Sequence, residues 1–167
     1  DQSVFTMTTP SEYLRRYPSN QVSMPSESSW GNGGYHEVWL DDSNDWIYRH
    51  LHKAAERMVH LANRYGAAQG SLKRALDQSA RELLLAQASD WAFIMKTGTM
   101  VEYARRRTQE HIGSFTELYY QITENRIDDQ WLSSLEQDHN IFSWMDYTIY
   151  AGDVRKASIP HLAVGLE

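Results

Sequence analysis

The sequence predicts an all-α fold, a helical bundle of three long helices plus short extra helices, preceded by a long irregular N-terminal segment. Apolar residues recur every three or four positions over 45–65, 71–86 and 99–124, which is the period of an amphipathic helix. Residues 1–44 show no such period and contain three of the four prolines together with a cluster of glycines. These observations together favour a bundle.

The first long helix is expected to begin near Asp45. Ser43 or Asn44 can cap its start, and Gly66 can end it. Its apolar face consists of Ile47, Leu51, Ala54, Met58, Leu61 and Tyr65.

The second long helix has Ser71 as a candidate N-cap. The positions on one of its faces are Leu72, Leu76, Ser79, Leu83 and Ala86. Its end, residues 83–86, is apolar nearly all round, which predicts a central position in the bundle. Residues 89–95 then interrupt the helical pattern before Gly98.

The third long helix is expected from about Thr99 to Glu124, and a short fourth helix fits Asp129 to Asp138. The stripe of the third helix consists of Met100, Tyr103, Ala104, Ile112, Phe115, Leu118, Tyr119 and Ile122. The tail after Ile141 is rich in aromatic residues, and we expect it to dock as an extended lid.

A chain of 167 residues is long enough for one domain with a hydrophobic core. We divide it into an irregular linker and aromatic loop over 1–44, a helical bundle over 45–150 and an unassigned tail over 151–167.

The composition excludes several classes of function. A net charge of −6 argues against a nucleic-acid partner, and the absence of cysteine excludes disulfides and thiolate metal sites. No apolar run approaches the ~20 residues of a membrane span. The start at Asp1 shows no signal peptide, so we expect a cytoplasmic protein, and the missing initiator Met fits a processed or excised piece.

Residues 28–39, which we call the aromatic loop, carry Trp30, Tyr35 and Trp39 among three glycines. Glycine allows tight turns that aim large rings in chosen directions, and flat rings presented from a loop suit the apolar face of a sugar. The alternative, that both tryptophans plug a helical core, is about equally supported by composition.

Asp90 and Trp91 interrupt the apolar segment between the second and third helices. A carboxylate beside an indole can accept hydrogen bonds from two sugar hydroxyls while the ring stacks. Asp90 as a helix cap or turn residue is an equally good interpretation.

Other candidate sites are weaker. His50 and His52 are two apart on a helix and face different ways, so we expect no metal site there. Arg105, Arg106 and Arg107 fan around a helix and are expected to pair with acidic neighbours such as Glu102 and Glu110. No nucleophile motif or phosphate-binding loop occurs, and no cofactor is expected.

Three ordered blocks of this sequence resemble the C-terminal helical domain of glycoside hydrolase family 57 1,4-α-glucan branching enzymes. The first is Ser-Ser-Trp-Gly-x-Gly-Gly-Tyr-x-Glu-Val-Trp-Leu at 28–40, followed by Asn-Asp-Trp-Ile-Tyr at 44–48. The second runs from Ala80 to Met95, and the third is Thr-Gly-Thr-Met-Val-Glu-Tyr-Ala at 97–104. The resemblance covers about residues 6–150 and departs from the family pattern after residue 142.

The resemblance implies a catalytic (β/α)7 barrel upstream of Asp1 that carries a Glu nucleophile and an Asp acid/base, so this chain alone is expected to be inactive. It further implies that the bundle packs on this barrel. Carried over by position, Trp30 and Trp39 match two tryptophans of the substrate cleft, and Asp90 with Trp91 matches an Asp-Trp element near it.

The function that follows is an accessory domain of a branching enzyme of glycogen biosynthesis, with an α-glucan (amylose or glycogen) and the upstream barrel as partners. The substrate-binding residues are then Trp30, Trp39, Asp90 and Trp91. The alternatives are the same domain in a family 57 amylase or 4-α-glucanotransferase, a free-standing glucan-binding module, and a bundle that only braces the barrel.

Overall fold

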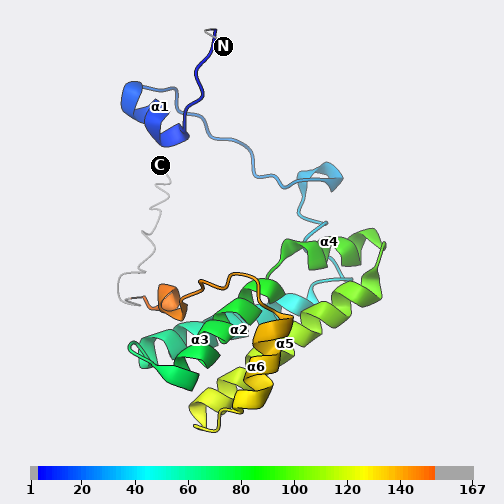
Figure 1. Cartoon of the computed structure of the whole chain (residues 1–167). Helices are drawn as coiled ribbons and strands as arrows, with labels where there is room; N and C mark the ends of the chain where they lie inside the picture. The colour runs from blue at the N-terminus through cyan, green and yellow to red at the C-terminus, as the bar shows by residue number, and fades with distance from the viewer. Residues whose placement is uncertain (1–3, 153–167) are drawn as a thin grey trace, which may run out of the picture.

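The computed structural model describes residues 4–152, and all regular structure in this range is helical (Figure 1). The predicted tail beyond residue 152 lies outside this range. In chain order the elements are α1 (Pro10–Arg16), the 3-10 turn η1 (Asn32–Gly34), α2 (Trp46–Arg64), α3 (Gly70–Ala86), α4 (Ser89–Thr97), α5 (Val101–Thr123), α6 (Asp129–Asp138) and the 3-10 turn η2 (Tyr147–Tyr150). The predicted all-α bundle of three long helices is confirmed.

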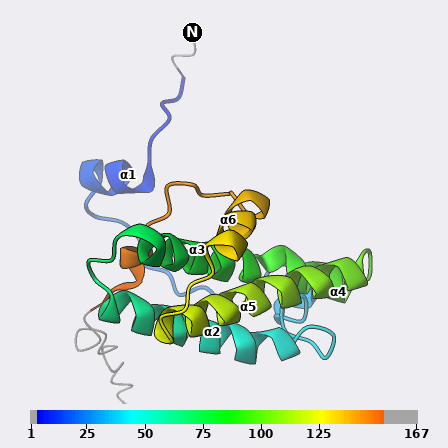
Figure 2. The same ribbon diagram turned by 60° about the horizontal axis from the view of Figure 1, so that its bottom comes forward.

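The long helices α2, α3 and α5 lie side by side, and each pair of them is in contact (Figure 2). Helix α3 also packs against α6 and η2, so the central position predicted from its apolar end is confirmed. Helix α4 packs on α5. No helix within residues 4–152 has both the length and the apolarity that a bilayer crossing requires.

Two hydrophobic cores hold the bundle together. The larger one lies between α2, α3, α5 and α6, with Met58, Leu76, Phe115 and Leu132 fully buried at its centre. The smaller one, which we call the second core, consists of Ile47, Leu51, Ala86, Ala92, Met95 and Ala104. Trp39, Trp46 and Trp91 pack against the outside of the second core.

Residues 89–97 form the helix α4, so the predicted interruption after α3 is wrong. Ala92 and Met95 are buried at a helical spacing of three, and both belong to the second core. The helix ends at Gly98, whose φ of 81° is left-handed and whose N–H donates to the carbonyl of Ile94.

The predicted helix N-caps are also corrected. Helix α3 begins at Gly70 with Gln69 as its N-cap, so it starts two residues earlier than an N-cap at Ser71 would give. Helix α2 has Asp45 at the cap position without a side-chain hydrogen bond, and the Asn44 side chain bonds elsewhere. Helix α2 ends at Arg64 with Tyr65 as its C-cap, so the predicted end of the helix at Gly66 is confirmed.

Residues 147–150 form the 3-10 turn η2, which packs against α2 and α3, so this part of the predicted extended lid is wrong. The Tyr147 side chain is buried, its hydroxyl donates to the carbonyl of Tyr65, and it accepts from the N–H of Ala68 at 3.1 Å. Tyr147 therefore anchors η2 at the turn between α2 and α3.

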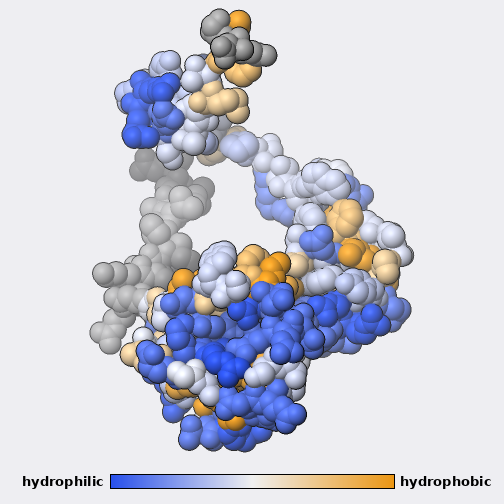
Figure 3. Space-filling view, viewed as in Figure 1, coloured by the Kyte–Doolittle hydropathy of each residue, from blue (hydrophilic) through white to orange (hydrophobic). Residues whose placement is uncertain are grey.

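The segment from residue 4 to 28 forms an arm that extends away from the bundle, and helix α1 contacts no other element of the described chain (Figure 1). Its apolar side chains are exposed, among them Val4, Met7, Leu14, Val22 and Met24. Figure 3 shows that hydrophobic side chains also gather on the side of the bundle that faces the arm. A surface of this kind is typical of a contact with another domain.

Candidate functional site

The aromatic loop is a tight turn that only glycine-rich sequence can adopt. Five of the six residues from 31 to 36 have a positive φ, and Gly31 is the most constrained of them. A Cβ on Gly31 would lie 3.2 Å from Val38 at a φ of +77°. The N–H of Ser29 donates to Gly34, and the Ser29 hydroxyl accepts from the N–H of His36 at 2.7 Å.

Asn44 joins the end of this loop to helix α4. Its side chain is fully buried, and its amide nitrogen donates to the carbonyls of Val38 and Ala92, each at 3.1 Å. Its amide oxygen accepts from the N–H of Asp41 at 2.9 Å. Because a buried amide left without partners is costly, this bonding holds the loop in one position against α4.

A second contact between the same two segments is an ion pair. Lys96 Nζ lies 2.7 Å from Asp41 Oδ2. The hydrogen bond from Lys96, with a further one from the Ser43 N–H, lowers the pKa of Asp41 from 3.8 to about 2. The Asp41 carboxylate therefore stays charged, and the pair stays formed, throughout the neutral range.

Trp30, Trp39 and Asp90 line one hollow of about 380 Å³, together with Ser89 and Phe93. Its volume falls in the range of small-ligand pockets, about 300–1,000 Å³. The structure thus brings together three of the four residues that the sequence singled out, although the aromatic loop and Asp90 lie more than 50 positions apart in the chain.

Phe93 is the residue that sequence reasoning missed. The ring centroids of Trp30 and Phe93 are 5.7 Å apart, those of Trp39 and Phe93 5.9 Å, and those of the two tryptophans 6.3 Å. The three rings tilt against one another by about 40–50°, which forms a curved aromatic wall rather than a flat stack. Recognising α4 as a helix would have found Phe93, because it lies one turn after Asp90.

The two tryptophans differ in how far they serve the core. Trp30 is 67% exposed, which is incompatible with a core position. Trp39 is half-buried, with one side against the second core and the other lining the hollow. The interpretation of both rings as core plugs is therefore wrong for Trp30 and holds only in part for Trp39.

Asp90 lies in the first turn of α4, where Ala88 is the N-cap and no side chain caps the helix. The carboxylate is therefore not a capping group. It is exposed in the first turn of the helix and lines the hollow.

Trp91 lies apart from this hollow. Its indole N–H donates to the carbonyl of Leu85 at 2.7 Å, and its ring lies against Tyr103 and His111. Adjacent residues on a helix point about 100° apart, so Asp90 and Trp91 face different surroundings.

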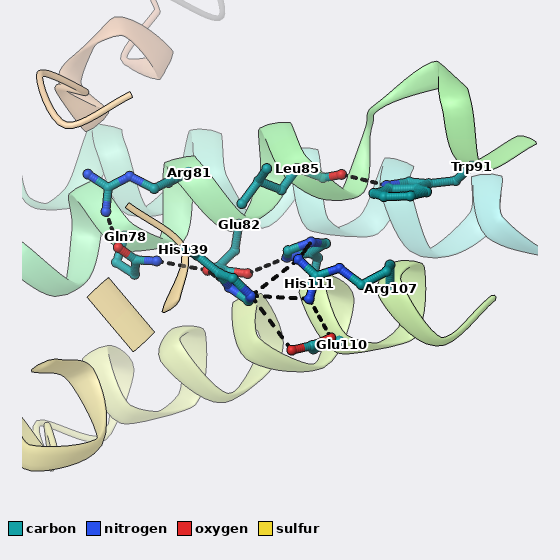
Figure 4. Close-up of polar contacts among 9 residues, drawn as sticks. All are labelled: Gln78, Arg81, Glu82, Leu85, Trp91, Arg107, Glu110, His111 and His139. Carbon is teal, nitrogen blue, oxygen red and sulfur yellow. Dashed lines mark hydrogen bonds and ion pairs between the residues drawn. The ribbon is translucent and has the colours of Figure 1, made fainter. Parts of the chain in front are cut away.

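A buried polar cluster lies between α3, α5 and the end of α6 (Figure 4). Both oxygens of the fully buried Glu82 are occupied, one by His111 Nδ1 and the other by His139 Nδ1, each at 2.8 Å. Arg107 lies on the far side of both rings, 3.0 Å from Nε2 of His111 and 3.4 Å from Nε2 of His139. Arg107 also pairs with Glu110 at 2.7 Å.

This geometry assigns the protons of the two histidines. A guanidinium can only donate, so Nε2 of each ring accepts and Nδ1–H donates to Glu82. Glu82, His111 and His139 are the only set within residues 4–152 with the spacing of a metal site, but Arg107 already supplies the positive charge there. The set fits a closed hydrogen-bond network between helices.

The predicted roles of the other charged groups hold in part. Arg105 pairs with Glu102 as expected, while Arg107 joins the buried cluster as well as pairing with Glu110. His50 and His52 are both exposed and lie against different rings, those of Trp46 and Tyr48.

Comparison with known proteins gives the family of the chain. Residues 50–150 match the family described as 1,4-alpha-glucan branching enzyme, C-terminal. The 1,4-alpha-glucan branching enzyme TK1436 of Thermococcus kodakarensis is 34% identical over 138 residues, which are 79% of this chain and 20% of that protein.

Solved structures show the same relationship. The alpha-amylase AmyC from Thermotoga maritima is 41% identical with a TM-score of 0.69, over 92% of this chain and 28% of that one. The GH57-type branching enzyme from Pyrococcus horikoshii is 34% identical with a TM-score of 0.72, over 85% and 28%. TK1436 in complex with glucose is 30% identical with a TM-score of 0.73, over 87% and 27%.

The chain spans between 20% and 28% of the length of these relatives. The resemblance predicted from the aromatic loop and the two later blocks is confirmed. The chain belongs to the family of C-terminal domains of 1,4-α-glucan branching enzymes.

Proposed function

We propose that this chain is the helical C-terminal part of an enzyme that branches α-1,4 glucans, and that Trp30, Trp39 and Asp90 contact the glucan. The observation that carries the proposal is the hollow that these residues share with Phe93. The matching relatives named as branching enzymes support the reaction class.

The hollow suits a sugar for two reasons. The C–H face of a pyranose is apolar and packs on the exposed ring of Trp30, while the sugar edge carries hydroxyls that donate to the Asp90 carboxylate. Such charge-assisted hydrogen bonds are about twice as strong as neutral ones. Phe93 widens the apolar wall, and Trp91 holds α4 against the bundle from the other side.

In the proposed parent enzyme the bond-making carboxylates belong to the upstream barrel. A retaining transfer forms a glycosyl-enzyme, which must meet the 6-hydroxyl of an acceptor chain before it meets water. Trp30 and Trp39 serve this step by covering the site and by ordering the acceptor. The loop that carries them is held by Asn44 and by the Asp41–Lys96 pair, so the rings are positioned before substrate arrives.

The upstream barrel is the partner that we propose for the exposed apolar surface. The relatives continue well beyond the part that this chain matches, and the arm leads away from the bundle toward the N-terminus. On the bundle, Phe142 and Trp144 form an exposed aromatic pair with centroids 6.1 Å apart, and Trp144 is 79% exposed.

A hydrolase is the second candidate, because the alpha-amylase AmyC is 41% identical over 92% of this chain. The bundle is compatible with either reaction, since both pass through a glucan bound in the cleft. The difference lies in whether the acceptor is a sugar hydroxyl or water.

The products of the full-length enzyme separate the two. Amylose is incubated with the enzyme, and new α-1,6 linkages are counted by debranching while reducing ends are counted directly. We expect α-1,6 linkages to outnumber new reducing ends, and this excess to be lost in an enzyme without residues 28–152. Reducing ends without branches would assign the parent as an amylase.

A further inference from the structure

A second hollow, of about 360 Å³, lies between α2 and α5, and it shares no residue with the one described above. Its lining residues are Trp46, Arg49, His50, Gln109, Ile112 and Gly113. The first three are spaced i, i+3 and i+4 on α2, and the last three are spaced in the same way on α5, so each helix presents one face to it.

The floor of this hollow is apolar and firmly held. Trp46 and Ile112 are both half-buried and pack against the second core. The rim is polar and exposed, with Arg49, His50 and Gln109. None of the six lining residues is a carboxylate, and within residues 4–152 no ion pair occupies Arg49, which donates from Nε to His50 Nε2 at 3.3 Å.

Gly113, which also lines this hollow, supports a binding site here independently of the other lining residues. It lies in the middle of α5, where glycine costs about 1 kcal/mol relative to alanine. A Cβ at this position would meet no atom within 4 Å, and the backbone has no positive φ. Neither packing nor backbone conformation requires glycine here, and the missing side chain leaves this side of the hollow open.

We propose that this hollow binds a second stretch of α-glucan, away from the Trp30–Trp39 site. The ligand class follows from the lining, because an uncharged sugar ring has an apolar face for Trp46 and hydroxyls for Arg49, His50 and Gln109. The inference rests on the proposed function for the identity of the sugar. A second contact on the same chain raises the apparent affinity for a long polymer through effective concentration.

Affinity electrophoresis of the full-length enzyme through gels that contain amylose tests the site. Gly113→Leu fills the hollow and replaces glycine by a better helix former, so the melting temperature is expected to stay or rise. We expect Gly113→Leu and Arg49→Ala to weaken retention by amylose about tenfold, as for loss of one stacking contact. Gln130→Leu, at an exposed position on α6, is the matched control and should be retained as the wild type.

Each outcome decides between named alternatives. Unchanged retention of Gly113→Leu overturns the second site. A lower melting temperature of the full-length enzyme with Gly113→Leu shows instead that the hollow receives another part of the protein, which also overturns it. Trp30→Ala is measured in parallel for branching rate, so failure of the first site appears in that variant alone and is distinguishable from failure of the second.

Discussion

At the scale of single residues, the tryptophans of this chain differ in whether their side chains are free to contact a ligand. Trp30 is two-thirds exposed and lines the hollow. The indole N–H of Trp91 instead donates to the carbonyl of Leu85, and its ring lies against the rings of Tyr103 and His111. A tryptophan whose polar atom and faces are already satisfied has little left for a ligand. The sequence alone predicts both as substrate-binding residues, because it does not show which side-chain atoms already have a partner within the protein.

Asp90→Asn tests the carboxylate in the hollow. The change keeps size but removes the charge, and a neutral acceptor is weaker by about 1 kcal/mol. Branching by the full-length enzyme should therefore fall about fivefold, while stability changes by less than about 1 kcal/mol, the worth of a charge at a helix N-terminus.

Glu102→Gln is the matched control for Asp90→Asn, since Glu102 is the acidic residue in the first turn of α5. It should lose as little stability as Asp90→Asn and no activity. Equal activities of the two variants would remove Asp90 from the site.

Glu82→Gln tests the buried cluster. Glutamine leaves one histidine Nδ1–H without an acceptor and removes the buried carboxylate that both rings share, so we expect a loss of about 3–5 kcal/mol in the free energy of unfolding. Glu110→Gln removes the exposed partner of the same arginine and should cost less than about 1 kcal/mol. Urea unfolding of the isolated chain measures both, and equal losses would contradict the network.

At the scale of elements, the sequence predicted the long helices well and the short ones poorly. The stripes of α2, α3 and α5 are about four to six turns long, so their period is unambiguous. Helix α4 has only nine residues and exposes Asp90 at its start, which resembles a break. Helix α1 carried a recognisable signal, a Thr9 cap followed by Pro10 and Glu12, but lies within an otherwise irregular segment.

The ion pair between Asp41, which follows the aromatic loop, and Lys96 of α4 predicts how the stability of the protein depends on pH. In the folded state the pKa of Asp41 is lowered to about 2, so the Asp41–Lys96 pair stabilises the protein above pH ~4, and this contribution is lost as the pH falls toward 2. In Lys96→Met the pKa of Asp41 should rise toward 3.8, and the acid-side loss of stability that Asp41 causes should shrink.

Carboxyl-carbon NMR titration of Asp41 checks this directly. An Asp41 pKa that is the same in the wild type and Lys96→Met would show that the loop is not held by this pair.

At the scale of the whole molecule, the described part of the chain exposes large apolar side chains, as a domain that contacts another domain does. The arm exposes Val4, Phe5, Met7, Val22 and Met24, and on the bundle Trp144 is exposed as well. The sequence suggested this from the missing helical period of residues 1–44, but no local pattern reveals which face of a bundle receives a partner. Contacts such as Asn44 to Ala92, 48 positions apart, are equally invisible in sequence.

The separately expressed chain should self-associate through this surface. A variant without residues 1–27 should form fewer oligomers, because it lacks most of the exposed apolar arm. Sedimentation velocity over a range of concentrations measures the change, and supplying the barrel should abolish association of the intact chain. A monomeric intact chain with no affinity for the barrel would contradict the proposed domain contact.

The most direct test of the account measures branching and melting temperature of the full-length enzyme with Trp30→Ala and with Trp39→Ala. A lost sugar contact is worth about 1–3 kcal/mol, whereas a tryptophan that serves only the core costs about 3–5 kcal/mol of stability. We predict at least a tenfold loss of branching in both variants, with an unchanged melting temperature for Trp30→Ala and a modest decrease for the half-buried Trp39→Ala. Normal branching by the folded fraction of both variants, whatever their melting temperatures, would show that the aromatic loop does not contact the glucan.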